Sequence, residues 1–168
     1  MRETQHLANN SQSTVEKRVF DVNILAIFLA EGHPGFTYVA PVVEAGLRGA
    51  YAPLIMDILP LRAFWIMTRR WGLDDKECST AIQHFIESYD MPKYPPLRKE
   101  TISEGFRLAE ELKHDVFDCI YVAFALQEKA ESIVTTDTDF KKICNQKGLR
   151  YINPVPEEIL KRFKEQNK

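Results

Sequence analysis

Short apolar runs alternate along the chain with longer segments in which apolar residues recur every three or four positions. The short runs end at polar or turn residues, which is typical of buried strands. They lie at residues 19–23, 50–56, 132–136 and 149–153. The longer segments predict helices, the clearest of them at residues 36–47, 57–71, 73–89, 100–114, 115–129, 140–146 and 157–166. Strands that alternate with helices in this way predict an α/β fold of three layers, α/β/α, around a mainly parallel central sheet.

The first seventeen residues differ in composition from the rest of the chain. Residues 1–17 contain a run of Asn, Ser, Gln and Thr and almost no large apolar side chain. Such a segment does not bury enough apolar surface to fold, so we expect a flexible arm followed by one domain over residues 18–168. No apolar run is long enough to span a membrane, and the N-terminus lacks the apolar stretch of a signal peptide. We therefore expect a soluble protein of the cytoplasm.

The cysteines and the net charge limit which kinds of metal site, cross-link and ligand the sequence suggests. The three cysteines are widely spaced and form no Cys-x-x-Cys pair, so we expect neither a structural zinc site nor a disulfide framework. The formal net charge of −2 does not indicate a nucleic-acid-binding protein. It does not exclude one either, because a metal ion held by carboxylates brings positive charge that a residue count misses.

Acidic residues stand at the edges of three separate apolar segments. Asp21 follows the first strand-like run, Asp118 opens an apolar helical segment, and Asp137 and Asp139 follow the run at residues 132–136. In an open parallel sheet the carboxyl ends of the strands meet at one edge, and ligands bind there. The sequence therefore predicts that these carboxylates converge.

Each of these acids also has a simpler interpretation. Asp21 is a good residue to cap the helix that follows it, and Asp118 suits the first turn of a helix because it interacts favourably with the helix dipole. We expect one of Asp137 and Asp139 to cap the helix at residues 140–146. Against a purely structural role, the neighbours of Asp118 are apolar on most sides, and a charge in such surroundings needs a partner or a metal ion.

Carboxylates that converge predict a site for a hard metal ion. Close carboxylates repel one another unless a cation lies between them, and oxygen ligands alone suit Mg²⁺ or Mn²⁺ rather than zinc. Such an ion polarises a phosphate and activates water for in-line attack. The chain has no Gly-x-Gly-x-x-Gly motif and no Walker-type phosphate loop, which favours phosphodiester hydrolysis over nucleotide transfer.

Three segments together resemble the PIN domain family. Residues 19–25 (VFDVNIL) are similar to its opening Asp-x-Asn strand, residues 114–125 (HDVFDCIYVAFA) to its third-acid helix, and residues 133–140 (IVTTDTDF) to its Thr-x-Asp-x-Asp-Phe segment. The resemblance implies a small metal-dependent ribonuclease, usually a homodimer, and often the toxin of a toxin–antitoxin pair. It implies metal ligands at Asp21, Asp118 and Asp137, with an accessory ligand at Asp139 and supporting or substrate-binding roles for Asn23 and for Thr135 or Thr136.

Arg62 is a departure from the family pattern. Members usually carry a glutamate early in the apolar helix that precedes the Arg-Arg-x-Gly end, and Arg62 occupies that place. Asp57 lies five residues earlier, which is about 500° of rotation in a regular helix, so it could take the place of the glutamate only if the chain enters the helix differently. Arg62 has three open roles: to pair with Asp21 and Asp118 in place of a metal ion, to contact the scissile phosphate, or to point into solvent. Arg69, at the end of the same segment, is a second candidate to steady charge on the phosphate.

Two main hypotheses follow. In the first, the chain is a Mg²⁺- or Mn²⁺-dependent endoribonuclease with Asp21, Asp118 and Asp137 as its catalytic acids. In the second, Arg62 replaces the metal ion and the chain is a catalytically degenerate PIN fold that binds RNA or a partner protein. A third possibility, that the acids are only helix caps, requires three caps to fall by chance at the family's spacing.

Overall fold

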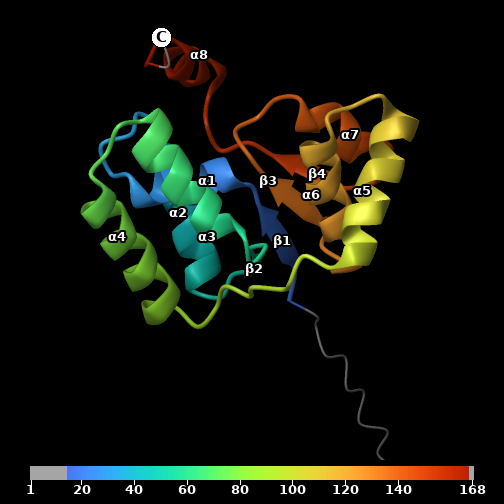
Figure 1. Cartoon of the computed structure of the whole chain (residues 1–168), viewed down its shortest axis with the longest axis horizontal. Helices are drawn as coiled ribbons and strands as arrows, with labels where there is room; N and C mark the ends of the chain where they lie inside the picture. The colour runs from blue at the N-terminus through green and yellow to red at the C-terminus, as the bar shows by residue number, and fades with distance from the viewer. Residues whose placement is uncertain (1–14, 167–168) are drawn as a thin grey trace, which may run out of the picture.

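A sheet of four parallel strands forms the centre of the molecule. The computed structural model describes residues 15–166, and the strands stand in the spatial order β2–β1–β3–β4 (Figure 1). They are β1 (Lys17–Phe20), β2 (Ala52–Leu54), β3 (Ser132–Val134) and β4 (Arg150–Ile152). All three pairings are parallel, so the four carboxyl ends lie at one edge of the sheet. The expected α/β class with a parallel sheet is confirmed.

Helices flank the sheet in two groups, α1 to α4 on one side in Figure 1 and α5 to α7 on the other, while α8, near the C-terminus, packs back through Phe163, whose ring centre lies 4.7 Å from that of His33. The helices are α1 (Val22–Leu29), α2 (Phe36–Leu47), α3 (Leu59–Trp65), the π-helical turn η1 (Ile66–Arg70), α4 (Asp75–Ser88), α5 (Lys99–Leu112), α6 (Val116–Gln127), α7 (Phe140–Gln146) and α8 (Glu157–Gln166). The helices from α2 onward overlap the segments predicted above to be helical, and α1 is the helix that was expected to follow Asp21.

The segment at residues 57–71 is not one regular helix as predicted. It begins at Leu59 as an α-helix and continues from Ile66 as a π-helical turn. The Thr68 hydroxyl donates a hydrogen bond of 2.8 Å to the Phe64 carbonyl, and such bonds to the preceding turn disturb regular helical bonding. The turn ends at Arg70, and Gly72, two residues later, has a φ of 66°, which is left-handed and favours glycine.

The two central strands carry the core. Val19 and Phe20 of β1 and Ile133 and Val134 of β3 are almost completely buried. Because a strand in the middle of a sheet is covered on both faces, these runs are continuously apolar rather than alternating. The burial of both strands fixes the residues that follow them at the carboxyl edge.

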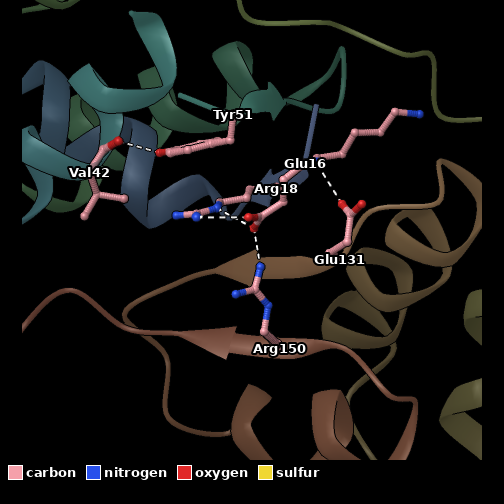
Figure 2. A network of polar contacts seen from close by, with 7 residues as sticks. Glu16, Arg18, Val42, Tyr51, Glu131 and Arg150 are labelled. Carbon is pink, nitrogen blue, oxygen red and sulfur yellow. Dashed lines mark hydrogen bonds and ion pairs between the residues drawn. The ribbon is translucent and has the colours of Figure 1, made fainter. Parts of the chain in front are cut away.

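The opposite, amino-terminal edge is closed by paired charges (Figure 2). Glu16 accepts a hydrogen bond of 2.7 Å from Arg18 and also pairs with Arg150 of β4, so it links strands that are not neighbours. The Arg18 guanidinium lies 4.0 Å from the centre of the Tyr51 ring, and the Tyr51 hydroxyl donates to the Val42 carbonyl. Charges at this edge are therefore satisfied within the protein, in contrast to those at the carboxyl edge.

The predicted arm falls mostly outside the described residues, which begin at Val15. The first strand starts at Lys17, one residue before the predicted domain boundary, and Glu16 already contacts the sheet. Among the described helices, none is long and apolar enough to cross a membrane.

Candidate active site

The carboxyl edge brings the segments after β1 and β3 side by side. The Asp21 amide donates a hydrogen bond of 3.0 Å to the Val134 carbonyl, which continues the β1–β3 pairing past the ends of both strands. Residues 135–137 follow at once, and α6 lies beside Asp21 through Tyr121, whose hydroxyl accepts a hydrogen bond from the Val22 amide. Three separate parts of the chain therefore meet here, as the sequence predicts.

Asp21 is buried with only 3% of its surface exposed. The Thr135 hydroxyl donates a hydrogen bond of 2.7 Å to its Oδ2, and the Tyr121 hydroxyl accepts one of 3.2 Å from the Val22 amide beside it. Burial raises the pKa of Asp21, and hydrogen bonds from Thr135 and Tyr121 partly oppose that rise. Asp21 stands at the N-cap position of α1 but makes no side-chain cap bond, so the interpretation of Asp21 as a simple helix cap is wrong.

Asp118 lies in the first turn of α6 with 19% of its side chain exposed. Its Oδ2 is 3.0 Å from Nε2 of His114, which is also 19% exposed. Burial raises the pKa of Asp118 to about 6, the charge of Asp137 adds to the rise, and the hydrogen bond from His114 opposes it. The cap of this helix is Asp115, whose Oδ1 accepts from the Phe117 amide at 2.8 Å. The capping role is thus filled by another residue, and the Asp118 carboxylate contacts His114 instead.

Asp137 forms hydrogen bonds within the loop that connects β3 to α7. Its amide donates a hydrogen bond of 3.0 Å to the Thr135 hydroxyl, the same hydroxyl that donates to Asp21. Its Oδ1 accepts from the Asp139 amide at 2.9 Å. Asp139 is exposed and occupies the N-cap position of α7, but it makes no side-chain cap bond. The prediction that Asp137 or Asp139 caps this helix is therefore wrong, because the Asp137 carboxylate orders its own loop instead.

The three carboxylates influence one another. The negative charge of Asp137 contributes to the raised pKa of both Asp21 and Asp118, which places Asp137 between the other two electrostatically. A cation among them would relieve this repulsion. Thr135 links Asp21 to Asp137 through one hydroxyl and so fixes their relative positions.

The donor chemistry fits a hydrated hard ion rather than a closed metal cage. In the part of the chain that the structure describes, no three His, Cys, Asp or Glu side chains are arranged so that they hold an ion by themselves. Over the same residues, one carboxylate oxygen of Asp118 and one of Asp137 accept no hydrogen bond. Mg²⁺ keeps several waters and is usually held by one or two carboxylates, so this donor set suits it.

Residues 18–146 match the family model of the PIN domain. The chain belongs to the PIN domain family. No curated protein sequence matches it.

Three solved structures share the fold. The sarcin–ricin loop cleaving toxin VapC20 of Mycobacterium tuberculosis matches with a TM-score of 0.60 and 11% sequence identity, and the match covers 75% of this chain and 94% of that one. VapBC2 of Rickettsia felis, bound to a DNA fragment from its promoter, matches with a TM-score of 0.62 and 16% identity, over 82% of this chain and 98% of that one. A toxin–antitoxin complex from Klebsiella pneumoniae matches with a TM-score of 0.57 and 17% identity, over 82% of this chain and 98% of that one. At these identities the likeness establishes the fold, and these chains match this PIN domain over nearly their whole length.

Arg62 of α3 does not pair with the acids. Its guanidinium carbon lies 5.3 Å from the centre of the Phe117 ring, and none of the described carboxylates forms an ion pair with it. Its charge nevertheless reaches the site, because it partly opposes the raised pKa of Tyr121. The interpretation that Arg62 binds Asp21 and Asp118 directly is wrong, and the guanidinium is left available at the rim of the PIN-domain site.

The other residues expected to bind substrate, Asn23, Thr136 and Arg69, differ in their surroundings. Asn23 is half-buried in the first turn of α1, and Thr136 is buried between Thr135 and Asp137. Arg69 belongs to η1, and its Nη2 is 3.1 Å from Oδ2 of Asp75, a pair that ties this turn to α4. Arg69 is therefore occupied by a structural contact.

Two site residues were missed in the sequence, His114 and Tyr121. Both contact the acids from positions spaced to share a helical face with Asp118, four residues before it and three after it. That spacing is a signal that points to them, although His114 precedes α6 and lies in the turn after α5. Phe117 was expected among the buried neighbours of Asp118, but 57% of its surface is exposed.

Proposed function

We propose that this PIN domain is a metal-dependent endoribonuclease that hydrolyses RNA phosphodiester bonds. The observation that carries the proposal is the set of acids at the carboxyl edge that make no helix-capping bond: the Thr135 hydroxyl bonds both Asp21 and the Asp137 amide, and Asp118 contacts His114 while Asp115 caps α6. The carboxyl edge of a parallel sheet is where such folds bind their ligands, and the pKa of Asp118, which burial and then the charge of Asp137 raise, agrees with a functional role.

In this proposal Asp21, Asp118 and Asp137 hold Mg²⁺ or Mn²⁺, with Asp139 as an accessory ligand. When bound, the ion supplies charge stabilisation on the phosphate and lowers the pKa of an attacking water. The protein's own groups orient the acids: His114 holds the Asp118 carboxylate, and the Thr135 hydroxyl holds Asp21.

Arg62 is the group we assign to the phosphate itself. A guanidinium presents planar donors that match phosphate oxygens, and this one has no carboxylate partner among the described residues. It would stabilise negative charge as it develops in the transition state. Asn23 and Thr136, beside Asp21 and Asp137 in sequence, are placed to support substrate binding, whereas Arg69 would first have to leave Asp75.

We further propose that the protein is the toxin of a toxin–antitoxin pair, acts in the cytoplasm and forms a homodimer. The support is the likeness of its fold to toxin and toxin–antitoxin structures. Leu61 and Trp65 on α3 are large, apolar and more than half exposed, and such side chains suit a protein interface. Sedimentation of the purified protein tests the dimer, and co-purification with the product of an adjacent reading frame tests the antitoxin.

The test of the enzymatic proposal is cleavage of a randomised pool of RNA by wild type, Asp118→Asn and Asp115→Asn. The Asp115 change is a matched control because it lies on the same helix and Asn preserves an N-cap. Wild type and the control should cleave with Mg²⁺ or Mn²⁺ and stop when a chelator is added, and Asp118→Asn should be inactive. Cleavage retained in Asp118→Asn would refute the assignment.

The alternative, a catalytically degenerate module, is favoured by one observation: Arg62 stands where the family usually has an acid. It predicts RNA or partner binding that a chelator does not change. Under that alternative, Arg62→Glu would create a metal site where wild type has none.

A further inference from the structure

Two hollows on the described surface differ in their chemistry. One, of about 550 Å³, is lined mainly by apolar side chains from α1, η1 and α4, and its rim carries the carboxylates Glu31 and Glu77 beside a single cation, Arg70. The other, of about 1140 Å³, follows α7 and β4 and reaches the acids through His114, Thr138 and Asp139. We call this second hollow the α7 groove.

The α7 groove is basic although the protein is acidic overall. Lys141, Lys142 and Arg150 line it against one carboxylate, Asp139. Arg150, at the amino-terminal end of β4, forms an ion pair with Glu16. Lys141 and Lys142 are exposed and have no ion-pair partner among the described residues. The positive charge of the groove without an ion-pair partner is thus that of Lys141 and Lys142, which follow Asp139 by two and three residues.

The stability of α7 does not explain these two lysines. They occupy the first turn of the helix, directly after Phe140, and that turn contains no acidic residue. The positive end of the helix dipole lies there and disfavours cations by a few tenths of a kcal/mol or more. A pair of lysines in this turn therefore costs stability, and a ligand with negative charge gives a reason for them.

We infer that the α7 groove binds the phosphodiester backbone of the RNA strand on one side of the bond to be cleaved, with Lys141 and Lys142 contacting successive phosphates. The inference rests on the proposed function, because it places the substrate of the same site. Exposed Thr138 and Asn145 add neutral hydrogen-bond donors along this path. The apolar hollow, with its carboxylates, does not suit a polyanion. The strand thus runs from Arg62, across the acids, into the α7 groove.

The experiment measures the affinity of a fluorescent 20-nucleotide RNA of mixed sequence as a function of salt, in a chelator so that no cleavage occurs. The proteins are wild type, Lys141→Gln/Lys142→Gln, and the control Lys76→Gln/Lys161→Gln. The control removes two charges that are exposed on α4 and α8, outside the groove. Each protein is also assayed for cleavage with Mn²⁺ and for melting temperature.

Two phosphate contacts contribute about 1.4 to the slope of log affinity against log salt for a single strand. Between 50 and 200 mM salt, wild type and the control should therefore lose about sevenfold more affinity than the groove variant. The groove variant should melt at the same temperature as wild type or slightly higher, since the helix dipole no longer opposes its side chains.

The inference is overturned if wild type and the groove variant have equal salt slopes, or if the slope falls as much in the control as in the groove variant. In either case the lysines would be ordinary solvated charges. If wild type cleaves RNA while the slopes are equal, only the groove assignment fails. If the slopes differ as expected but no protein cleaves RNA with Mn²⁺, the groove assignment holds and the enzymatic proposal fails. If wild type does not bind the RNA, both fail.

Discussion

Replacing Asp118 by Asn should make the protein more stable while it removes the proposed activity. The carboxylate is held at an unfavourable place: burial and the charge of Asp137 both raise its pKa, and the hydrogen bond from His114 only partly compensates. Asn is isosteric, keeps a polar contact within reach of His114, and carries no charge to desolvate or to repel Asp137.

The size of the effect follows from the pKa. A rise from 3.8 to about 6 corresponds to ~3 kcal/mol at most, because each tenfold change in proton affinity is worth about 1.36 kcal/mol. Solvent screens part of this, since 19% of the side chain is exposed. We therefore expect Asp118→Asn to increase the free energy of unfolding by about 1–2 kcal/mol at pH 7.5.

The raised pKa of Asp118 also sets how the free energy of unfolding changes with pH. The folded protein holds the Asp118 proton more tightly than the unfolded chain, so wild type is most stable below about pH 4 with respect to this group. That stability is lost as the pH rises from about 4 through 6. Asp118→Asn lacks this titration, so the difference between the two proteins should be near zero at pH 4 and fully developed at pH 7.5.

The assay is urea unfolding of wild type, Asp118→Asn and Asp115→Asn at both pH values, in a chelator to remove divalent ions. Asp115→Asn controls for the loss of one carboxylate from α6 and should show a smaller difference. A destabilised Asp118→Asn at pH 7.5, or a difference that is as large at pH 4, would refute the argument that the Asp118 charge is strained.

Three further changes test other parts of the site and its support. Thr135→Val removes the hydroxyl that donates to buried Asp21, and should lower the free energy of unfolding by about 1.5–3 kcal/mol in urea titrations; an unchanged value would show that Asp21 does not need this bond. Arg62→Glu should bind Mn²⁺ at least about tenfold more tightly than the control Arg62→Gln, which is equivalent to ~1.4 kcal/mol. Equal Mn²⁺ affinities in the two variants would count against a metal site within reach of this position. Gly105→Ala would place a Cβ 2.6 Å from Cγ1 and 3.2 Å from Cα of Ile120 across the α5–α6 contact, so we expect thermal unfolding to show a loss of about 1–3 kcal/mol, and a stabilised variant would mean that the helices are not held this closely.

The helices were predictable where both of their ends carry a local signal. The segment at residues 36–47 matches α2 residue for residue, because Gly35 and Gly49 bound it, and α8 begins at Glu157 as predicted, directly after Pro156. The π-helical turn η1 was not predictable, since its apolar pattern suits a regular helix and the Thr68 side-chain bond depends on the folded backbone. Three strands were predicted at the right places but too long, whereas β1 begins two residues before the predicted run and ends at Phe20, because pairing with a neighbour sets where a strand begins and ends.

The acids of the site were predictable individually, and their surroundings were not. The sequence shows Asp21 between a strand and a helix, where a cap is the common role, and only the tertiary pairing with Thr135 reveals what its carboxylate does. Asp139 likewise stands at a cap position without capping. For Arg62, the sequence left three roles open, and packing beside Phe117 rather than against Asp118 decides among them.

The central claim is that Asp118 belongs to a working site for a divalent ion, and Mn²⁺ binding followed by electron paramagnetic resonance tests it most directly. Wild type and Asp115→Asn should show saturable binding, and Asp118→Asn should leave the Mn²⁺ free. Absence of saturable binding to wild type, or equal binding to Asp118→Asn, would contradict the account and favour a PIN domain that has lost its metal.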